Sequence, residues 1–157
     1  MKILLIAVGK TDNKLVFQLI EEYVKRVNFY IPLELNTLSD VKKSKKISVK
    51  EQKLLEGSCI KKSLQPSDYV VLLDDKGKQH TSINFAKYIE NKMISVPKRL
   101  VFIIGGPYGF SEEIEGLSNE KLSLSKMTLT HQMVRLLFVE QLYRAMTILN
   151  NEPYHHE

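Results

Sequence analysis

The sequence predicts a single α/β domain over residues 1–157, with a mostly parallel sheet and helices on both of its faces. Three short apolar runs, at 2–8, 69–73 and 100–104, alternate with longer segments of helical periodicity. Strands that are apolar throughout are typical of parallel sheets covered on both sides. Alternation of strand and helix favours right-handed crossovers between parallel strands. A chain of 157 residues is also long enough to bury a core without disulfides.

The first third of the chain predicts two strands around one helix. The buried strand at 2–8 is followed by apolar residues at helical spacing over 13–27, for which we expect Asp12 to be the N-cap. Apolar and polar residues then alternate around 31–35. We place this strand near an edge of the sheet, because Pro32 cannot donate to a strand ladder.

The middle of the chain predicts a charged surface loop and two further helices. The loop holds the lysine-rich run at 40–46. Helices are expected at 48–64, with modest amphipathicity, and at 82–94. The buried strand at 69–73 lies between them and should end in a turn at 74–78.

After the strand at 100–104, the chain enters the turn Gly105-Gly106-Pro107-Tyr108-Gly109. We expect a short helix that begins at Ser111 with acidic residues in its first turn, and a short strand at 121–125. A long helix should follow at 131–149, with Thr130 as its N-cap.

The last helix is apolar around most of its circumference, which indicates burial on more than one side. One side can pack on the sheet. The other can pack against a partner subunit, or the helix can be the central helix of an unusual monomer.

Composition limits the function classes. The net charge of +5 is compatible with an anionic partner such as RNA, but it does not require one. The single cysteine, Cys59, excludes a disulfide within the chain and is expected to be a small buried apolar residue rather than a nucleophile. Neither a metal-ligand spacing nor a membrane-spanning run is present in the sequence, so we expect a cytoplasmic protein without metal.

Ligands of open parallel sheets bind beyond the carboxyl ends of the strands. Two such ends stand out, at Asp74 and at Gly105, but neither matches a glycine motif that binds phosphate. The hydroxyl-rich segment 123–132 leads into the last helix and offers backbone donors. We expect it to form a third wall of the ligand site, beside the two strand ends. His131 is expected to be a first-turn helix residue rather than a catalyst. These patterns alone predict a ligand-binding α/β domain.

Several motifs together resemble the RlmH family, which are pseudouridine N3-methyltransferases of large-subunit ribosomal RNA in the SPOUT class. The resemblance runs from Met1 to the tail. Its motifs are Ala7-Val8-Gly9-Lys10, Leu72-Leu73-Asp74, Ile104-Gly105-Gly106-Pro107-Tyr108-Gly109, Leu122-Ser123-Leu124-Ser125-Lys126-Met127-Thr128, His131-Gln132-Met133-Val134-Arg135, Glu140-Gln141-Leu142-Tyr143-Arg144-Ala145 and Pro153-Tyr154-His155.

The resemblance implies a C-terminal trefoil knot, a homodimer with the pocket near the subunit interface, and S-adenosylmethionine as cofactor. The implied substrate is a pseudouridine of 23S ribosomal RNA in the assembled ribosome. Cofactor contacts carried over by motif are Leu73, Gly105, Leu124, Ser125, Lys126, Met127, Thr128 and Leu129. Two positions depart from the family pattern: Thr130 replaces a proline, and His156 replaces a basic residue.

For catalysis we expect the Tyr-His ending, which in the family lies on the substrate side of the pocket. Tyr154 would contact the base, His155 would accept its proton, and Arg144 would stabilise the anion that forms. Phosphate contacts are expected from Lys42, Lys43, Lys45 and Lys46. One alternative is a basic α/β module that binds RNA without chemistry. A flavodoxin-like or phosphatase-like enzyme is a weaker alternative, because no phosphate loop or nucleophile follows the first strand.

Overall fold

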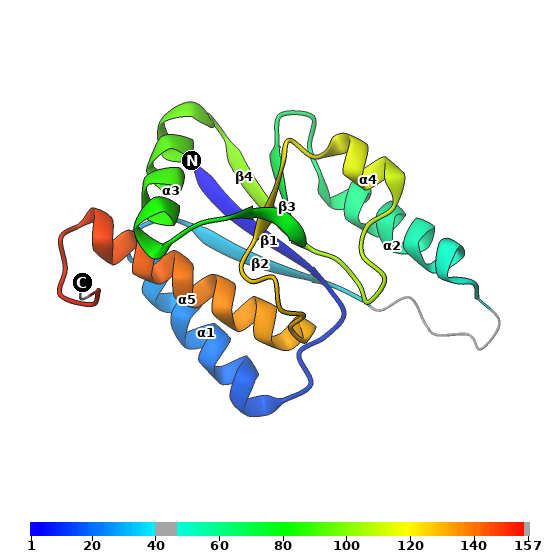
Figure 1. The fold of residues 1–157 in the computed structure, drawn as a ribbon, viewed down its shortest axis with the longest axis horizontal. Coiled ribbons are helices and arrows are strands. Elements are labelled where there is room, and N and C mark those ends of the chain that lie inside the picture. The colour runs from blue at the N-terminus through cyan, green and yellow to red at the C-terminus, as the bar shows by residue number, and fades with distance from the viewer. Residues whose placement is uncertain (40–46, 156–157) are drawn as a thin grey trace.

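A five-stranded sheet, parallel throughout, forms the centre of the computed structural model, which describes residues 1–39 and 47–155 (Figure 1). The order of its strands is β2-β1-β4-β3-β5. The strands are β1 (Lys2–Val8), β2 (Leu33–Leu38), β3 (Tyr69–Gln79), β4 (Arg99–Ile104) and β5 (Glu120–Ser123). The predicted parallel α/β class is therefore confirmed, and β2 lies at an edge, as Pro32 indicated.

Helices cover both faces of this sheet (Figure 1). The helices are α1 (Lys14–Asn28), α2 (Val49–Ser63), α3 (Ser82–Ser95), α4 (Glu112–Leu117) and α5 (His131–Leu149). Alternate residues of β1 face opposite sides, as the pleat requires. Ile3 and Leu5 pack in a cluster with the buried residues of α1, α3 and α5, whereas Leu4 and Ile6 pack with Ile60 of α2 and Ile114 of α4.

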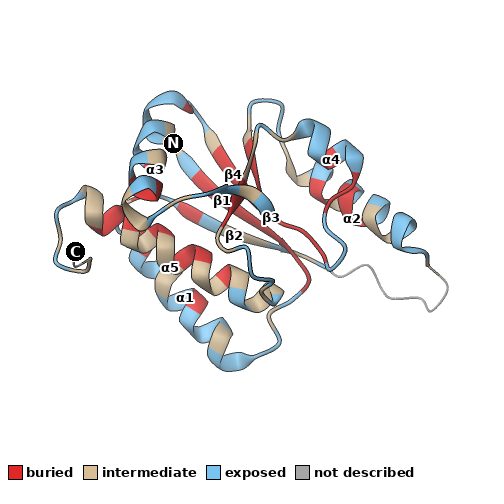
Figure 2. Cartoon of the chain, viewed as in Figure 1, coloured by how far each residue is buried: buried red, intermediate tan, exposed pale blue. Residues whose placement is uncertain are grey.

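The strands β1 and β4 form the centre of the core and are buried along almost their whole length (Figure 2). These strands sit in the middle of the sheet order, and helices pack on both of their faces. Their continuous apolar runs predicted this burial from the sequence. The core therefore holds the carboxyl ends of the central strands in fixed positions.

The strand predicted around 31–35 is shifted toward the carboxyl end and spans Leu33–Leu38. Three details of capping, turn and burial also differ from the sequence-based expectations. The N-cap of α1 is Asn13, whose side chain accepts from the amides of Leu15 and Val16; Asp12 is not the cap. The turn expected at 74–78 lies within β3, whose pairing with β5 shifts register between Leu73 and Lys78. Cys59 is partly exposed rather than buried, because it lies beside the buried face of α2 that Glu56 and Ile60 define.

The helix α5 has the predicted bounds, and Thr130 caps it through a hydrogen bond from the amide of Met133. It lies between α1 and α3 (Figure 1). Val139 and Leu142 are fully buried in this chain, whereas Leu136 and Leu137 are half-buried. Arg135 is also buried and donates to the Val8 carbonyl at 2.7 Å and to Thr11 Oγ1 at 2.8 Å, which ties the first half of α5 to the end of β1. The trefoil knot stays a prediction.

Candidate functional site

A cavity of about 450 Å³ opens at the carboxyl end of β4 and beside the middle of β3, where the pairing with β5 shifts register. Three segments that are far apart in sequence form most of its wall: residues 73–76 of β3, the loop after β4, and the segment that links β5 to α5. We call it the strand-end cavity. Its lining comprises Lys53, Leu73, Asp74, Asp75, Lys76, Ile104, Gly105, Gly106, Tyr108, Gly109, Phe110, Glu115, Leu124, Ser125, Met127, Thr128, Leu129, His131 and Val134.

The loop after β4 is a tight turn that brings backbone to the cavity wall. The amide of Gly109 donates to the Gly106 carbonyl at 3.1 Å, and Gly109 has a φ of +77°, which favours glycine. A side chain at Gly105 would meet the ring of the buried Phe110, with Cβ 3.0 Å from Cε1. A side chain at Gly105 therefore requires the Phe110 ring to shift, independently of any ligand.

The segment before α5 is held by short-range hydrogen bonds. Ser125 Oγ accepts from the amide of Met127 at 2.9 Å, and the Ser123 hydroxyl donates to the Ser125 carbonyl at 3.0 Å. Thr130 has a φ of −65°, which is the angle that a proline ring would impose. The replacement of proline by threonine therefore leaves the backbone in the same conformation, and the hydroxyl adds a cap to α5.

The charged residues of the cavity differ from wall to wall. In the middle of β3, burial raises the pKa of Asp74, but the hydrogen bond from the Lys76 amide (2.9 Å) and the nearby Lys121 outweigh burial, so that the pKa lies below its usual value. Asp74 is therefore anionic at neutral pH. Lys53 reaches the cavity from α2 on the opposite side.

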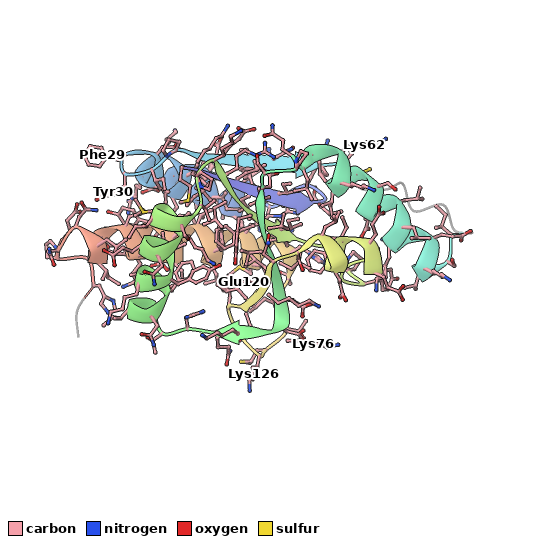
Figure 3. All side chains as sticks on the ribbon, turned by 90° about the horizontal axis from the view of Figure 1, so that it is seen from above. Phe29, Tyr30, Lys62, Lys76, Glu120 and Lys126 are labelled. Carbon is pink, nitrogen blue, oxygen red and sulfur yellow. The ribbon has the colours of Figure 1, made fainter. Side chains whose placement is uncertain are left out.

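Seven of the eight residues expected to contact the cofactor line this cavity; Lys126 does not. Lys126 is exposed and extends away from the body of the molecule, on the same side as Lys76 (Figure 3). Lys53, Glu115 and Val134 also line the cavity but were not predicted, because nothing in their local sequence places α2, α4 and α5 beside the end of β4 and the middle of β3.

The three residues expected to be catalytic lie together in a second cluster. Arg144 donates to Glu140 Oε1 at 2.7 Å and contacts His155 Nδ1 at 3.4 Å. Because a guanidinium only donates hydrogen bonds, Nδ1 of His155 is the acceptor in this pair. Tyr154 donates to the same Glu140 oxygen at 3.1 Å, and its hydroxyl also lies 3.2 Å from that of Tyr23. We call Glu140, Arg144, Tyr154 and His155 the tail cluster.

The tail is anchored to α1 rather than frayed. Tyr30, two residues after the end of α1, donates to Glu152 at 2.7 Å, and this hydrogen bond raises the pKa of Tyr30 to about 12. Burial, with the neighbouring Tyr23 and Glu140, raises the pKa of Tyr154. Tyr154 is therefore protonated at neutral pH and can act as a donor but not as a base.

The tail cluster and the strand-end cavity lie at opposite ends of α5 (Figure 1). The cavity contacts α5 at His131 and Val134, whereas Arg144 comes ten residues after Val134. At 1.5 Å per residue, this separation is about 15 Å along the helix axis. In one chain, the tail cluster therefore does not border the cavity.

The remaining expectations concern lysines, metal and membrane. Lys42, Lys43, Lys45 and Lys46 lie outside the described residues. Within residues 1–39 and 47–155, no group of three or more metal-ligating side chains is found. Among the helices that the structure describes, none is long and apolar enough to cross a membrane.

Comparison with known proteins identifies the class of this fold and cavity. A family model described as a predicted SPOUT methyltransferase matches residues 1–155, and the chain belongs to that family. The flavodoxin-like and phosphatase-like alternatives are therefore wrong.

Individual relatives are similar along the whole chain. The chain is 59% identical to the ribosomal RNA large subunit methyltransferase H of Parabacteroides distasonis and 54% identical to that of Phocaeicola vulgatus, over 100% of both chains in each case. It is 53% identical to the ribosomal RNA large subunit methyltransferase H of Christiangramia forsetii, over 99% of both chains. The resemblance that the motifs indicated is confirmed.

Proposed function

We propose that this protein transfers a methyl group from S-adenosylmethionine to N3 of a pseudouridine in 23S ribosomal RNA, in the assembled cytoplasmic ribosome. Methylation of ribosomal RNA is supported by membership of the SPOUT methyltransferase family and by full-length similarity to large-subunit methyltransferases. The observation that carries the proposal is the strand-end cavity, which gathers three distant segments at the ligand-binding edge of the sheet.

The residues of the cavity fit the proposed cofactor. A volume of about 450 Å³ is within the usual range for a small-molecule site. Leu73, Leu124 and Leu129 offer an apolar slot for an adenine ring, and the backbone of the loop after β4 offers polar groups beside it. When bound, S-adenosylmethionine supplies an electrophilic methyl group on a sulfonium.

The cofactor contacts proposed for this chain are Leu73, Gly105, Leu124, Ser125, Met127, Thr128 and Leu129, which line the cavity. Lys126 is retained as a contact through its main chain only, because its side chain points away from the body of the molecule (Figure 3).

The acceptor atom must lose a proton. The S–CH₃ bond breaks as the N3–CH₃ bond forms, the sulfonium becomes a neutral thioether, and the N3 proton passes to a base. We assign that base to Nδ1 of His155, which accepts the proton once Arg144 has turned away from it to stabilise the anion, while Tyr154 turns its single O–H from Glu140 to the nucleobase. The tail cluster holds these three side chains in contact.

A second copy of the chain is needed to bring the tail cluster to a cavity. In an isologous contact whose two-fold axis is perpendicular to α5, the two α5 helices run in opposite directions, and this is the arrangement that we propose. The carboxyl end of one α5 then faces the amino end of the other, where the cavity lies. The apolar side chains of Leu15, Leu19 and Met133 are exposed on α1 and α5 and are available for this contact.

A binding module without chemistry is the second candidate, and the excess of basic residues favours it equally. It predicts that neither S-adenosylmethionine nor its demethylated product binds. Phosphate contacts from Lys42, Lys43, Lys45 and Lys46 belong to either candidate, and both predict binding that weakens as salt increases.

Two measurements test the proposal. In isothermal titration calorimetry, the purified chain should bind S-adenosylmethionine; absence of binding would favour the RNA-binding module. Mass mapping of 23S ribosomal RNA from a strain that lacks the gene should show one pseudouridine without its methyl group, restored by the gene. If the same methyl group is present in both strains, the proposed substrate is wrong.

A further inference from the structure

Glu56 is an ionisable side chain buried in the helix that backs the strand-end cavity. It lies on α2 and is only 4% exposed. Its Oε1 accepts from the Gln52 side chain at 2.8 Å, one turn earlier on the same helix. No residue in the described part of the chain donates to Oε2, which is also buried from solvent.

The carboxyl group of Glu56 lies next to Gly106, which lines the cavity. A Cβ atom at Gly106 would lie 2.6 Å from Oε1 and still closer to Oε2. The carboxyl group is therefore adjacent to a glycine that lines the cavity, although it does not line the cavity itself. Lys53 comes from three residues earlier, on the same face of α2, and reaches the cavity itself.

The position of Glu56 is fixed by the packing of α2. A Cβ at Gly57 would meet Ser111 Oγ at 2.5 Å, so the helix lies as close to the start of α4 as a glycine permits. Burial of a carboxylate without a full set of hydrogen bonds disfavours the folded state. Such a group in a native protein calls for a functional explanation.

We infer that the Glu56 carboxylate provides a negative potential behind the Gly106 wall, which makes the cavity prefer a cationic ligand over a neutral one of the same shape. This inference rests on the proposed function. Under that function, the ligand that arrives is a sulfonium cation and the ligand that leaves is a neutral thioether. The two differ by one methyl group and one positive charge.

The preference of the cavity for a cation would distinguish the cofactor from its product although Glu56 touches neither ligand. Both ligands carry the same adenosine and the same amino-acid group, so these parts bind equally well in either. The carboxylate stabilises only the charged sulfur, and this attraction is lost when the methyl group leaves. Glu56 is therefore a positioning and selectivity residue that favours exchange of product for fresh cofactor.

The kinetic consequence distinguishes this role from catalysis. A carboxylate near the sulfonium stabilises the ground state at least as much as the transition state, in which the positive charge is already dispersed. Removing it should raise KM for the cofactor and leave kcat unchanged or slightly higher. A base or a residue needed for the fold would lower kcat instead.

The test compares Glu56→Gln with the parental chain by calorimetry, with S-adenosylmethionine and S-adenosylhomocysteine as the two ligands. The expected result is a loss of about tenfold in affinity for the cation and of less than about twofold for the neutral product, as for one charge across a screened protein interior. Glu113→Gln is the matched control. It removes the same charge from α4, where Glu113 pairs with Lys61 and does not line the cavity.

The outcomes separate the inference from the proposed function. If the parental chain binds neither ligand, the proposed function fails and the inference fails with it. If the parental chain binds both and Glu56→Gln weakens both equally, or neither, Glu56 has no selectivity role and only the inference is overturned. Equal loss of kcat and kcat/KM for the cofactor would also overturn it.

A folding defect does not confuse the result. Thermal unfolding without ligand should show Glu56→Gln to be at least as stable as the parental chain, because the amide removes a buried charge. The ratio of the two dissociation constants is also independent of the fraction of protein that is folded. Sinefungin, which carries an ammonium group in place of the methyl sulfonium, should follow S-adenosylmethionine in its loss of affinity.

Discussion

The first turn of α5 borders a cavity with an apolar slot and backbone polar groups, whereas its last turns carry a dense cluster of charged and aromatic side chains. The first end is suited to bind a small molecule, but none of the three side chains to which we assign the proton transfer lines it. The second end offers a histidine, an arginine and a tyrosine in mutual contact, but no cavity of its own. Each end has what the other lacks.

This difference is the reason why we propose that a second copy of the chain completes the site. About 15 Å of helix axis separates Val134 from Arg144 in one chain. No change of side-chain rotamer spans that distance. An antiparallel pairing of two α5 helices brings unlike ends together twice, once at each cavity.

The largest expected effect is at the cavity end. Gly105→Val should reduce binding of S-adenosylmethionine to below detection, because the new side chain meets Phe110 and displaces the cavity wall. Calorimetry measures the binding, and circular dichroism checks the fold. Gly116→Ala is the control, since a Cβ there has no neighbour within 4 Å and should leave binding intact. Parental affinity in Gly105→Val would remove this loop from the site.

The next prediction tests whether the tail cluster of one chain serves the cavity of the other chain. Deletion of residues 154–157 should lower single-turnover methyl transfer at least ~10²-fold, with cofactor binding nearly unchanged. Co-expression with Gly105→Val should then recover roughly a quarter of the parental activity, because half of the dimers are mixed and each has one complete site. If the mixture stays inactive although mixed dimers form, each tail serves its own chain.

His155→Ala tests the role of the base within that cluster. If His155 accepts the proton, this substitution should lower the single-turnover rate of methyl transfer about as much as the tail deletion does. The pH–rate profile gives the sharper readout, since loss of the base should remove the limb that reports its protonation. A parental rate across neutral pH would assign the proton to another acceptor.

A smaller effect concerns the surface between the two copies. Leu137→Lys should keep the fold and weaken the dimer, because Leu137 is half-buried in one chain. Val139→Lys should instead lower the free energy of unfolding by about 3 kcal/mol or more, because Val139 is fully buried in its own core. Light scattering should give about twice the chain mass of 18.1 kDa for the parental protein. A monomer that methylates RNA would contradict this arrangement.

The smallest effect lies at the amino ends of β3 and β5, remote from the cavity edge. Glu120 accepts from Lys92 and Tyr69; burial raises its pKa, but these hydrogen bonds outweigh burial and hold the pKa below its usual value. The stabilisation is therefore complete above the unfolded pKa of about 4.3 and is lost as pH falls through the folded pKa.

Glu120→Gln should accordingly lower stability by about 1 kcal/mol or less at pH 7, with a smaller difference near pH 3. Urea unfolding at the two pH values measures it. Methyl transfer should stay at the parental level, and a loss comparable to that of the tail deletion would show that this region belongs to the site.

The sequence predicted the residues of the site that follow apolar strands, but it did not predict the residues that α2 brings beside them. Leu73 and Gly105 lie at the ends of apolar runs, and parallel strands present their carboxyl ends at one edge, so their meeting follows from the pattern. Lys53 and Glu56 lie on a helix of weak amphipathicity. Nothing in their local sequence indicates that α2 approaches Gly106, and this contact depends on the packing of α2 beside α4.

By itself, the sequence determined the parallel α/β class, the bounds of β1 and α5, and the three segments that form the cavity, because strand and helix periodicities and turn residues act over short range. The resemblance of its motifs added the family. Only the tertiary structure decided that the tail folds back on α1 at the far end of α5, and that a buried carboxylate stands behind Gly106. Both depend on where whole elements come to rest on the sheet, which is decided by the fit of their packed surfaces and not by any local pattern.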